Sequence, residues 1–384
     1  MYRGNNRPHK LFKTSPRPIG SGQFGIVYSV KASSDERRNF ALKILKEDND
    51  VGLREAEIHR VLQRHNQHCP NIIRYYKSFI NKDRICLCME LMQYTVREAT
   101  EDYPKQQLPM TCIQKILRQV INGIGYLGNW DITHTDINPE NLVCNSSNFD
   151  LVKIIDLSSA FRGTQHRDNT LTTIAYRCPD VMWNDILSPK IDIWSLGMTL
   201  FELCIGKPFL RGESAYEQMS LYCDYFGLPP LSIVSSENID AKDFNNFFEV
   251  ADGQIRLCTD EEYHQRTKIH PVLGGETKPF TRLDTLFEEQ YVNIDSQNHH
   301  EEQLEKADFK NFNILLTRML LWNVDERASV EDVMNSPFLV NSQLERYRNR
   351  GARQPIVVSV ENHSLHMRAM DMVPEDVEID EYAL

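Results

Sequence analysis

A glycine-rich segment near the start of the chain has the spacing Gly-x-Gly-x-x-Gly, in Gly20-Ser21-Gly22-Gln23-Phe24-Gly25. Because glycine has no Cβ, backbone N–H groups at such positions can approach phosphate oxygens closely. The spacing alone also fits a dinucleotide-binding turn or an ordinary hairpin, but a dinucleotide-binding turn opens a helix. Residues 26–30 are instead a β-type run, which favours a loop between two strands that covers the phosphates of a nucleotide.

A lysine lies within the next β-type run, at Lys43 of residues 40–45. Such a lysine either reaches solvent at the edge of a sheet or contacts anions, and for an isolated lysine both interpretations stay open. Residues 52–64 have apolar side chains at helical spacing, and Glu55 on this predicted helix can pair with Lys43. Glu57 is the competing partner, but side chains two positions apart on a helix do not face the same way.

Carboxylate and carboxamide side chains occur in two later segments. Asp136 and Asn141 are five residues apart in a short polar stretch, and Asp156 ends the apolar run 151–155. A carboxylate there can accept a hydroxyl proton, and carboxylate and amide oxygens are ligands that suit Mg²⁺. Taken alone, Asp156 would more often be a turn residue. Asp136 and Asn141 thus predict a proton acceptor and a metal ligand, and for Asp156 both a magnesium ligand and a turn residue stay open.

The elements that must position these residues divide the chain into two parts. Residues 19–91 have the pattern of strands, with one helical interruption. From about residue 95 helices dominate, and Thr111 is the predicted N-cap of the first long one. Helices are predicted at 111–127, 191–205, 307–321 and 329–334. Residues 229–300 lack clear periodicity and are interpreted as an insertion with loops.

Composition excludes several classes of protein. The chain has 384 residues, is 41% hydrophobic and 25% charged, and carries a net charge of −11, which argues against whole-chain disorder and generic nucleic-acid binding. It has no apolar run long enough to span a membrane and no secretory signal. Nine cysteines without a CxxC pair indicate reduced thiols rather than a disulfide framework. We therefore expect a monomeric intracellular protein, nuclear or cytoplasmic, that binds neither nucleic acid nor membrane.

Both ends of the chain carry charge of one sign. The N-terminal residues are basic, and 1–12 are interpreted as a flexible arm. Residues 371–384 contain six acids and no base, and they end a tail that spans 339–384. This acidic end is interpreted as a solvated segment, with a docking role as the alternative.

In order and spacing, these segments resemble the signature motifs of eukaryotic protein kinases. The resemblance continues in Tyr176-Arg177-Cys178-Pro179-Asp180, in Asp192-Ile193-Trp194-Ser195-Leu196-Gly197 and at Arg327, and it covers about 13–338. It implies an α+β, bilobal kinase fold, with a small β-rich N-lobe (about 13–91) and a larger, mainly helical C-lobe (about 92–338). The His134-Thr135-Asp136 triplet with Pro139-Glu140-Asn141 resembles Clk-like and splicing-factor kinases. The segment Gly52-Leu53-Arg54-Glu55 and the pair Tyr176-Arg177 look like the group of cyclin-dependent, mitogen-activated, Clk-like and dual-specificity-regulated kinases, which includes homeodomain-interacting kinases.

The resemblance also implies ATP as substrate and Mg²⁺ as cofactor. The loop from Gly20 to Gly25 (Gly20, Ser21, Gly22, Gln23, Phe24, Gly25), continued by Ile26, would cover the phosphates. Ile19, Val27 and Ala41 would enclose adenine, Met89 would be the gatekeeper, and the backbone of Glu90, Leu91 and Met92 would bind adenine. Lys43, held by Glu55, would contact the α- and β-phosphates.

For the transfer itself, the resemblance implies that Asp136 orients the substrate hydroxyl and accepts its proton. Asn141 and Asp156 would bind magnesium, Asp192 would brace the catalytic loop, and Asp180 would pair with Arg327. Protein substrates phosphorylated on Ser or Thr are implied. The group's arginine, here Arg177, further implies a preference for Pro after the target residue.

The sequence departs from the kinase pattern at four positions. Asn138 stands where the catalytic loop normally has lysine, and Ser158 stands in place of the Gly of the DFG motif. Asp180 replaces a glutamate, and Thr135 replaces an arginine. Two functions therefore remain open: an active Ser/Thr kinase made slow by Asn138, and a nucleotide-binding pseudokinase that acts as a scaffold.

Overall fold

The computed structural model describes residues 11–13, 17–22, 24–32, 35–46, 49–63, 68–163, 172–183, 188–234, 241–274 and 299–340. They belong to two compact units, which are described separately. The first unit takes in the described parts of Met1–His59 and Ile73–Leu91, and the second takes in those of Arg60–Ile72 and Met92–Leu344. The predicted basic arm and acidic tail lie outside the described residues, apart from strand Leu11–Lys13 and the last residues before 341.

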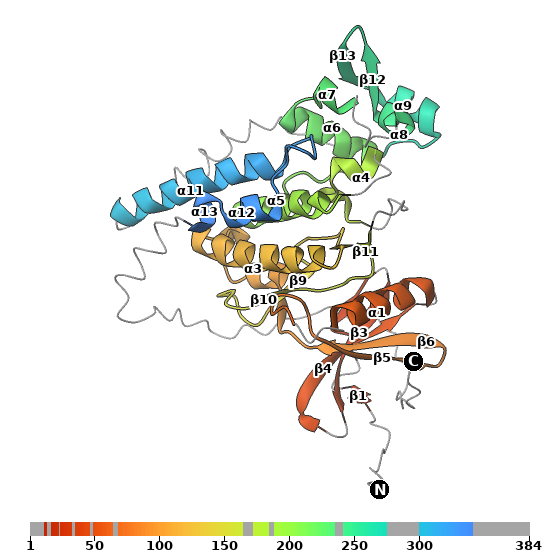
Figure 1. Cartoon of the computed structure of the whole chain (residues 1–384), viewed down its shortest axis with the longest axis vertical. Helices are drawn as coiled ribbons and strands as arrows, with labels where there is room; N and C mark the ends of the chain where they lie inside the picture. The colour runs from red at the N-terminus through yellow and green to blue at the C-terminus, as the bar shows by residue number, and fades with distance from the viewer. Residues whose placement is uncertain are drawn as a thin grey trace. The chain divides into compact units, whose positions relative to one another are not determined.

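The first unit is an antiparallel sheet with one helix (Figure 1). The strands follow the order β1 (Leu11–Lys13), β3 (Gly25–Ala32), β4 (Asp35–Leu45), β6 (Arg84–Glu90) and β5 (Tyr75–Asn81), and the short β2 (Gly20–Ser21) pairs with β3. Helix α1 (Asn49–Gln63) follows β4 in the chain. The predicted strand 72–79 begins later, at Tyr75, because Ile72 instead forms an isolated bridge with Ile154.

The two faces of this sheet carry different side chains, because successive residues of a strand point to opposite sides. Tyr75 stacks on His59 of α1, with ring centroids 4.8 Å apart, so α1 covers one face. The opposite face carries a buried cluster, formed by Tyr28, Val30, Ala32, Leu42, Phe79, Cys86 and Cys88. Half-buried Ile26, Phe40, Ile44 and Tyr76 pack around it.

The second unit is mainly helical (Figure 1). Helix α3 (Met110–Gly128) packs against α5 (Lys190–Ile205), α11 (His299–Met319), α12 (Val330–Met334) and α13 (Pro337–Val340). Thr111 is not the N-cap of α3, as the sequence had suggested: the helix begins one residue earlier, and Pro109 is the cap, without a side-chain hydrogen bond. Proline is suited to a helix start because its fixed φ costs nothing there.

Several short strands and short helices lie between the long helices of the second unit. The shorter elements of this region are β7 (Tyr94–Thr95), α2 (Val96–Thr100), the 3₁₀ helix η1 (Pro104–Gln106), β8 (Ile132–Thr133), β9 (Leu142–Cys144), β10 (Val152–Ile154), β11 (Phe161–Arg162), the 3₁₀ helix η3 (Ile174–Tyr176) and α4 (Pro179–Trp183). β9 lies between β7 and β10, and β8 pairs with β11. The loops between β8 and β9 and after β10 carry Asp136, Asn141 and Asp156.

The segment interpreted as an insertion with loops contains regular structure. After α6 (Ala215–Phe226) come α7 (Leu231–Val234), α8 (Ala241–Phe247), the hairpin of β12 (Phe248–Ala251) and β13 (Gln254–Leu257), and α9 (Asp260–Thr267). The rings of Phe244 and Phe248 pack on Trp183 of α4, with centroids 5.6 and 5.9 Å away. The described part of this segment is therefore anchored to α4 by an aromatic contact.

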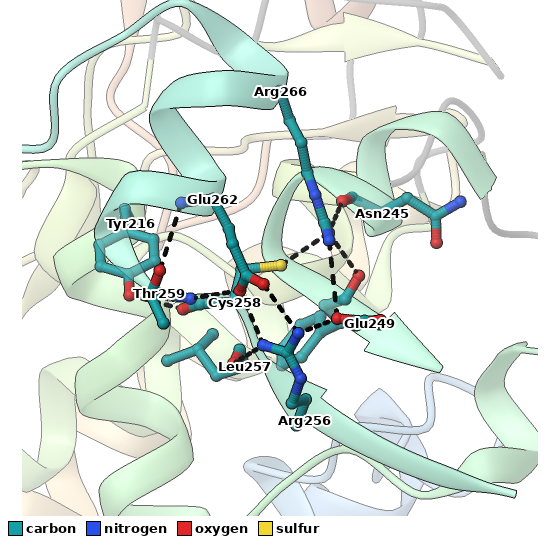
Figure 2. A network of polar contacts seen from close by, with 10 residues as sticks. Tyr216, Asn245, Glu249, Arg256, Leu257, Cys258, Thr259, Glu262 and Arg266 are labelled. Atoms are coloured by element: carbon teal, nitrogen blue, oxygen red, sulfur yellow. Dashed lines mark hydrogen bonds and ion pairs between the residues drawn. The ribbon is translucent and has the colours of Figure 1, made fainter. Parts of the chain in front are cut away.

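A polar network joins the hairpin of this insertion to α9 (Figure 2). Arg256 forms a bidentate pair with Glu262, at 2.7 and 2.8 Å, and also contacts Glu249 across the hairpin. Arg266 donates to the carbonyl of Phe248 at 3.0 Å and to the sulfur of Cys258. One arginine from each element thus ties hairpin and helix together.

All nine cysteines are free thiols, and only Cys223 is partly exposed. None of the helices in the described ranges is both long and apolar enough to cross a bilayer.

Candidate active site

Lys43 and Glu55 form a buried ion pair in the first unit. The Lys43 Nζ lies 3.1 and 3.0 Å from the two carboxylate oxygens of Glu55, and the two residues are 5% and 0% exposed. Desolvation largely offsets the attraction within such a pair, so its effect is to fix the position of the ammonium group rather than to add stability. Val27 on β3 is the register partner of Lys43.

The glycine-rich loop is a hairpin between β2 and β3, as favoured from the sequence over a dinucleotide-binding turn. The N–H of Gly22 donates to the carbonyl of Gly25 at 2.9 Å, and Lys46 donates to the carbonyl of Gly22. A Cβ on Gly25 would lie 2.8 Å from the carbonyl oxygen of Ile44, so a side chain cannot fit there. Gln23 lies outside the described residues.

The residues expected around adenine lie on neighbouring strands. Ala41 on β4 is the register partner of Met89 on β6, and β6 ends at Glu90. Ile26, which was expected to continue the loop over the phosphates, has its side chain on the opposite face of the sheet, against the buried cluster. Of the other residues expected to contact the nucleotide, three are exposed, namely Ile19, Gly20 and Ser21. Phe24, Leu91 and Met92 are half-buried.

Asn141 and Thr173 of the second unit hold Asp136 by three hydrogen bonds. The amide nitrogen of Asn141 donates to its backbone carbonyl at 2.8 Å and to its Oδ2 at 2.7 Å, and the N–H of Thr173 donates to its Oδ1 at 2.9 Å. Because the side-chain N–H groups of Asn141 are directed to Asp136, the side-chain oxygen Oδ1 of Asn141 is the atom that can bind a cation.

Asp192 fixes the backbone that precedes Asp136. Its carboxylate accepts the N–H groups of His134 and Thr135, both at 2.7 Å. Burial raises the pKa of this carboxyl group, while the two backbone hydrogen bonds act in the opposite direction. The N–H of Asp136 donates to Nδ1 of His134, so Nε2 carries the ring proton and donates to the carbonyl of Ile155 at 2.8 Å.

The side-chain amide of Asn138 both accepts and donates hydrogen bonds in the catalytic loop. Its Oδ1 accepts the N–H groups of Glu140 and Asn141 at 3.0 and 3.2 Å. Its Nδ2 donates to the carbonyl of Asp136 at 3.1 Å and to the hydroxyl of Thr173 at 3.3 Å. A lysine could make the donor bonds but not the acceptor bonds, so the hydrogen bonds of this loop need a side chain that both donates and accepts.

Asp156 and Asn141 flank the antiparallel pair of β9 and β10. The N–H of Ile155 donates to the carbonyl of Asn141 at 3.0 Å, which extends the pair by one residue. Asp156 has a left-handed backbone (φ 60°) and accepts the N–H of Ser158 at 3.2 Å. Carboxylate and amide oxygens are hard donors, so these two residues fit a magnesium ion.

Strain in this segment lies at Asp156 and not at Ser158, the residue in place of glycine. Among described residues with positive φ are Asp156 and Thr135 (φ 74°), whereas Ser158 is not among them. The hydroxyl of Thr135 donates to the carbonyl of Ser159 at 3.1 Å. Thr135 thus connects the catalytic loop to the segment after Asp156 by a hydrogen bond rather than by charge.

Sequence reasoning missed a partly buried network around Arg97 on α2, in which Tyr176 and Glu202 are buried and Glu140 is exposed. Arg97 pairs with Glu202 of α5 and with Glu140 of the catalytic loop, at 3.2 Å for the latter, and donates to the hydroxyl of Tyr176 at 3.0 Å. Burial raises the pKa of Tyr176, and the neighbouring Glu202 raises it further. The network joins four elements far apart in sequence, so no local motif signals it.

A second buried network contains Asp180 and Arg327. The guanidinium of Arg327 lies 2.6 Å from Oδ2 of Asp180, and both side chains are nearly inaccessible. The thiol of Cys178 donates to the same oxygen at 2.6 Å. Burial raises the pKa of this thiol well above its usual value, so it stays protonated and serves as a donor.

Arg177 folds back onto the segment before it. Its Nε donates to the hydroxyl of Thr172 at 2.7 Å, and its Nη2 donates to the backbone carbonyl of the same residue. The hydroxyl of Tyr222 in turn donates to the carbonyl of Arg177 at 2.8 Å. The backbone carbonyls of Thr172 and Arg177 are therefore already occupied by the chain itself.

Comparison with known proteins gives one family. The protein kinase domain family matches residues 14–339. Homeodomain-interacting protein kinase 1 of Caenorhabditis elegans is 28% identical over 344 residues, which cover 86% of this chain and 40% of that protein. Homeodomain-interacting protein kinase 2 of Mus musculus is 29% identical, covering 85% and 27%, and homeodomain-interacting protein kinase 4 of Rattus norvegicus is 27% identical, covering 85% and 54%. The chain thus spans between about a quarter and a half of these curated relatives.

Proposed function

Because the chain belongs to the protein kinase family, we propose that it transfers the γ-phosphoryl group of ATP to Ser or Thr hydroxyls of protein substrates. The family and the α+β kinase fold are those expected from the motifs, and the named relatives agree with the expected group. The observation that carries the proposal is Asp136, whose carboxylate is oriented by Asn141 and Thr173 on a backbone fixed by Asp192.

Each residue of the proposed site is assigned one role in phosphoryl transfer. The Asp136 carboxylate positions the substrate hydroxyl and accepts its proton. Lys43, fixed by Glu55, contacts the phosphates of ATP, and Asn141 with Asp156 would hold Mg²⁺. The metal, when bound, neutralises charge that develops on the phosphate oxygens. The glycine-rich loop supplies backbone N–H groups, and Ala41 with Met89 supplies apolar surface for adenine.

The direct test is transfer of labelled γ-phosphate from ATP to a basic protein, with Asp136→Asn as the control. Asparagine keeps an oxygen that can accept the N–H of Thr173 but cannot accept a proton from the substrate. Equal labelling by both proteins would disprove the kinase function. If ATP with Mg²⁺ raises the melting temperature but no transfer occurs, the chain is a nucleotide-binding pseudokinase.

Asn138 makes the proposed enzyme slow, because a neutral donor stabilises charge on the phosphoryl group less than a lysine does. We expect Asn138→Lys to raise kcat by about tenfold, less than the ~10² that one charged donor supplies. The gain is smaller because lysine cannot accept the N–H groups of Glu140 and Asn141, so the melting temperature should fall. Asn138→Asp, which keeps the acceptor without the positive charge, is the control. An unchanged or lower kcat for Asn138→Lys would contradict this role.

We also propose that the substrate residue after the target is Pro. Arg177 occupies the carbonyl and the hydroxyl of Thr172, so the backbone N–H of the substrate residue after the target finds no acceptor at Thr172. Proline has no backbone N–H and therefore loses nothing at this position. Peptides with Pro at this position should react about tenfold faster than those with Ala, the effect of one unmade hydrogen bond. Arg177→Ala should remove the preference. A peptide array without enrichment of Pro would refute the idea.

We place this activity inside the cell, in the nucleus or cytoplasm, and in a monomer. Nine free thiols fit a reducing compartment.

A further inference from the structure

The face of the first unit's sheet opposite α1 carries four cationic side chains. Arg38 alternates with Phe40 and Leu42 on β4, Lys77 pairs in register with Cys88, and Arg84 alternates with Cys86 on β6. Arg74 stands just before β5. We call this surface the basic face, and it consists of Arg38, Arg74, Lys77 and Arg84 with the rings of Phe40, Tyr76 and Phe79.

The cations of the basic face lie over aromatic rings. The guanidinium carbon of Arg38 is 5.4 Å from the centre of Phe40 and 5.1 Å from that of Tyr76, and Arg74 is 5.5 Å from Tyr76 on its own account. The Lys77 ammonium is 5.7 Å from Phe79. Such stacking helps to hold these long side chains in place, and Lys77 is half-buried. Arg38, Arg74 and Arg84 are exposed.

The positive charges act together on the groups beneath them. The pKa of Cys88 is raised to about 11 by burial, and Lys77 and Arg38 oppose that rise. The pKa of Tyr76 is also raised by burial, with Arg38 and Arg74 opposing it and Glu90 adding to it. Among the described side chains, Glu90 opposes Arg38 and Arg74 at Tyr76, and the four cations of the basic face outnumber it.

The chain itself contains a segment of matching chemistry. Residues 371–384 hold Asp371, Glu375, Asp376, Glu378, Asp380 and Glu381 and no base. Within them, Val377 and Ile379 alternate with acids. In an extended conformation, this alternation places carboxylates on one side and apolar groups on the other. Such a segment complements a surface on which cations and aromatic rings are interleaved.

We propose that the acidic segment 371–384 binds the basic face within the same molecule. Individual surface ion pairs contribute little and are screened by salt, so a separate acidic peptide would bind weakly. A covalently attached segment acts at an effective concentration in the ~mM range. The 30 residues 341–370 that connect it to Val340 can span at most about 100 Å, and a small domain is roughly 30 Å across.

Carbodiimide coupling of the full chain tests the proposal, because it joins a lysine amine to a carboxylate in direct contact. We expect Lys77 to couple to carboxylates of 371–384 in the monomer. Lys31, which is exposed on β3 and points to the other side of the sheet, is the control lysine and should not couple to them. The Lys77 products should fall at least tenfold between about 0.1 and 1 M salt, where the Debye length drops from about 10 to 3 Å.

Charge reversal provides matched variants. Arg38→Glu combined with Arg74→Glu should lower Lys77 coupling at least about tenfold, because two like charges then face the segment. Arg54→Glu, the same change at an exposed arginine of α1, should leave it unchanged. The melting temperature of each variant checks that it is folded. Neutralising the six acids leaves the basic face intact and should increase the exposure of Lys77 to amine-reactive reagents.

Three results would overturn the proposal. One is coupling of the segment to Lys31 as readily as to Lys77. Another is coupling that survives reversal of Arg38 and Arg74 in folded protein. The third is coupling only between copies, which an equal mixture of ¹⁴N- and ¹⁵N-labelled chains reveals as isotopically mixed products.

Discussion

Asp156→Ala and Lys43→Met are each expected to lower phosphoryl transfer by at least about 10²-fold, because each removes a charge that acts on phosphate or metal in a preorganised site. The two changes differ in their structural cost. Lys43→Met leaves Glu55 buried without its cation, which destabilises a fold strongly. Asp156 is only half-buried, so Asp156→Ala is the cleaner test. Turnover and melting temperature should be measured on the same preparations.

Two controls separate chemistry from folding in this experiment. Asp252→Ala makes the same change at another aspartate with positive φ (52°), in the hairpin turn of the insertion, and should leave turnover unchanged. Lys43→Met combined with Glu55→Gln removes both charges and should recover stability but not activity. Near-normal turnover by folded Asp156→Ala would mean that the motif assignment is wrong.

Asp180→Ala is expected to lower the free energy of unfolding by about 3–5 kcal/mol, because it leaves the buried Arg327 cation without its partner. Cys178→Ala removes only one donor to the same carboxylate and should cost about 1 kcal/mol. Urea unfolding measures both, and an unchanged m-value would show that only stability has changed.

The shorter acid and the thiol act as one unit, which a double-mutant cycle can measure. Asp180→Glu restores the glutamate of the kinase pattern with a side chain one methylene longer, and Cys178→Ala removes the thiol that contacts the carboxylate. We expect the combined variant to be more stable than the sum of the single changes predicts, with a coupling of about 0.5–3 kcal/mol. Strict additivity would show that the two residues are independent.

The sequence predicted well those elements whose apolar spacing extends over several turns or residues. The long helices α3 and α5 and the strands β3 and β4 fall where periodicity placed them, because burial on one or both faces leaves a clear pattern. Their ends were less certain, and Thr111 illustrates why: it is a good cap by type, but the chain begins the helix at Met110, after Pro109. The helices and hairpin at 231–267 were missed because each is too short for a period to show.

The candidate site was predictable where a motif is local. Asp136, Asn141 and their hydrogen bonds lie within five residues of one another, and Lys43 needs only one partner on the next helix. Arg97 and Glu202 were missed because their contact joins elements about a hundred residues apart. From the sequence, Asn138 was interpreted only as the loss of the positive charge of the usual lysine. Its side-chain oxygen also accepts two backbone N–H groups, which the residue type alone does not reveal.

The burial of the cysteines makes this chain well suited to site-directed labelling. Eight of the nine thiols are buried, and burial raises the pKa of Cys86, Cys204 and Cys223 to about 12. Since the thiolate is the reactive form, alkylating reagents at neutral pH should modify the folded protein slowly and mostly at Cys223. With Cys223→Ser as background, a cysteine introduced at an exposed position could carry a fluorophore or spin label without removal of the other eight.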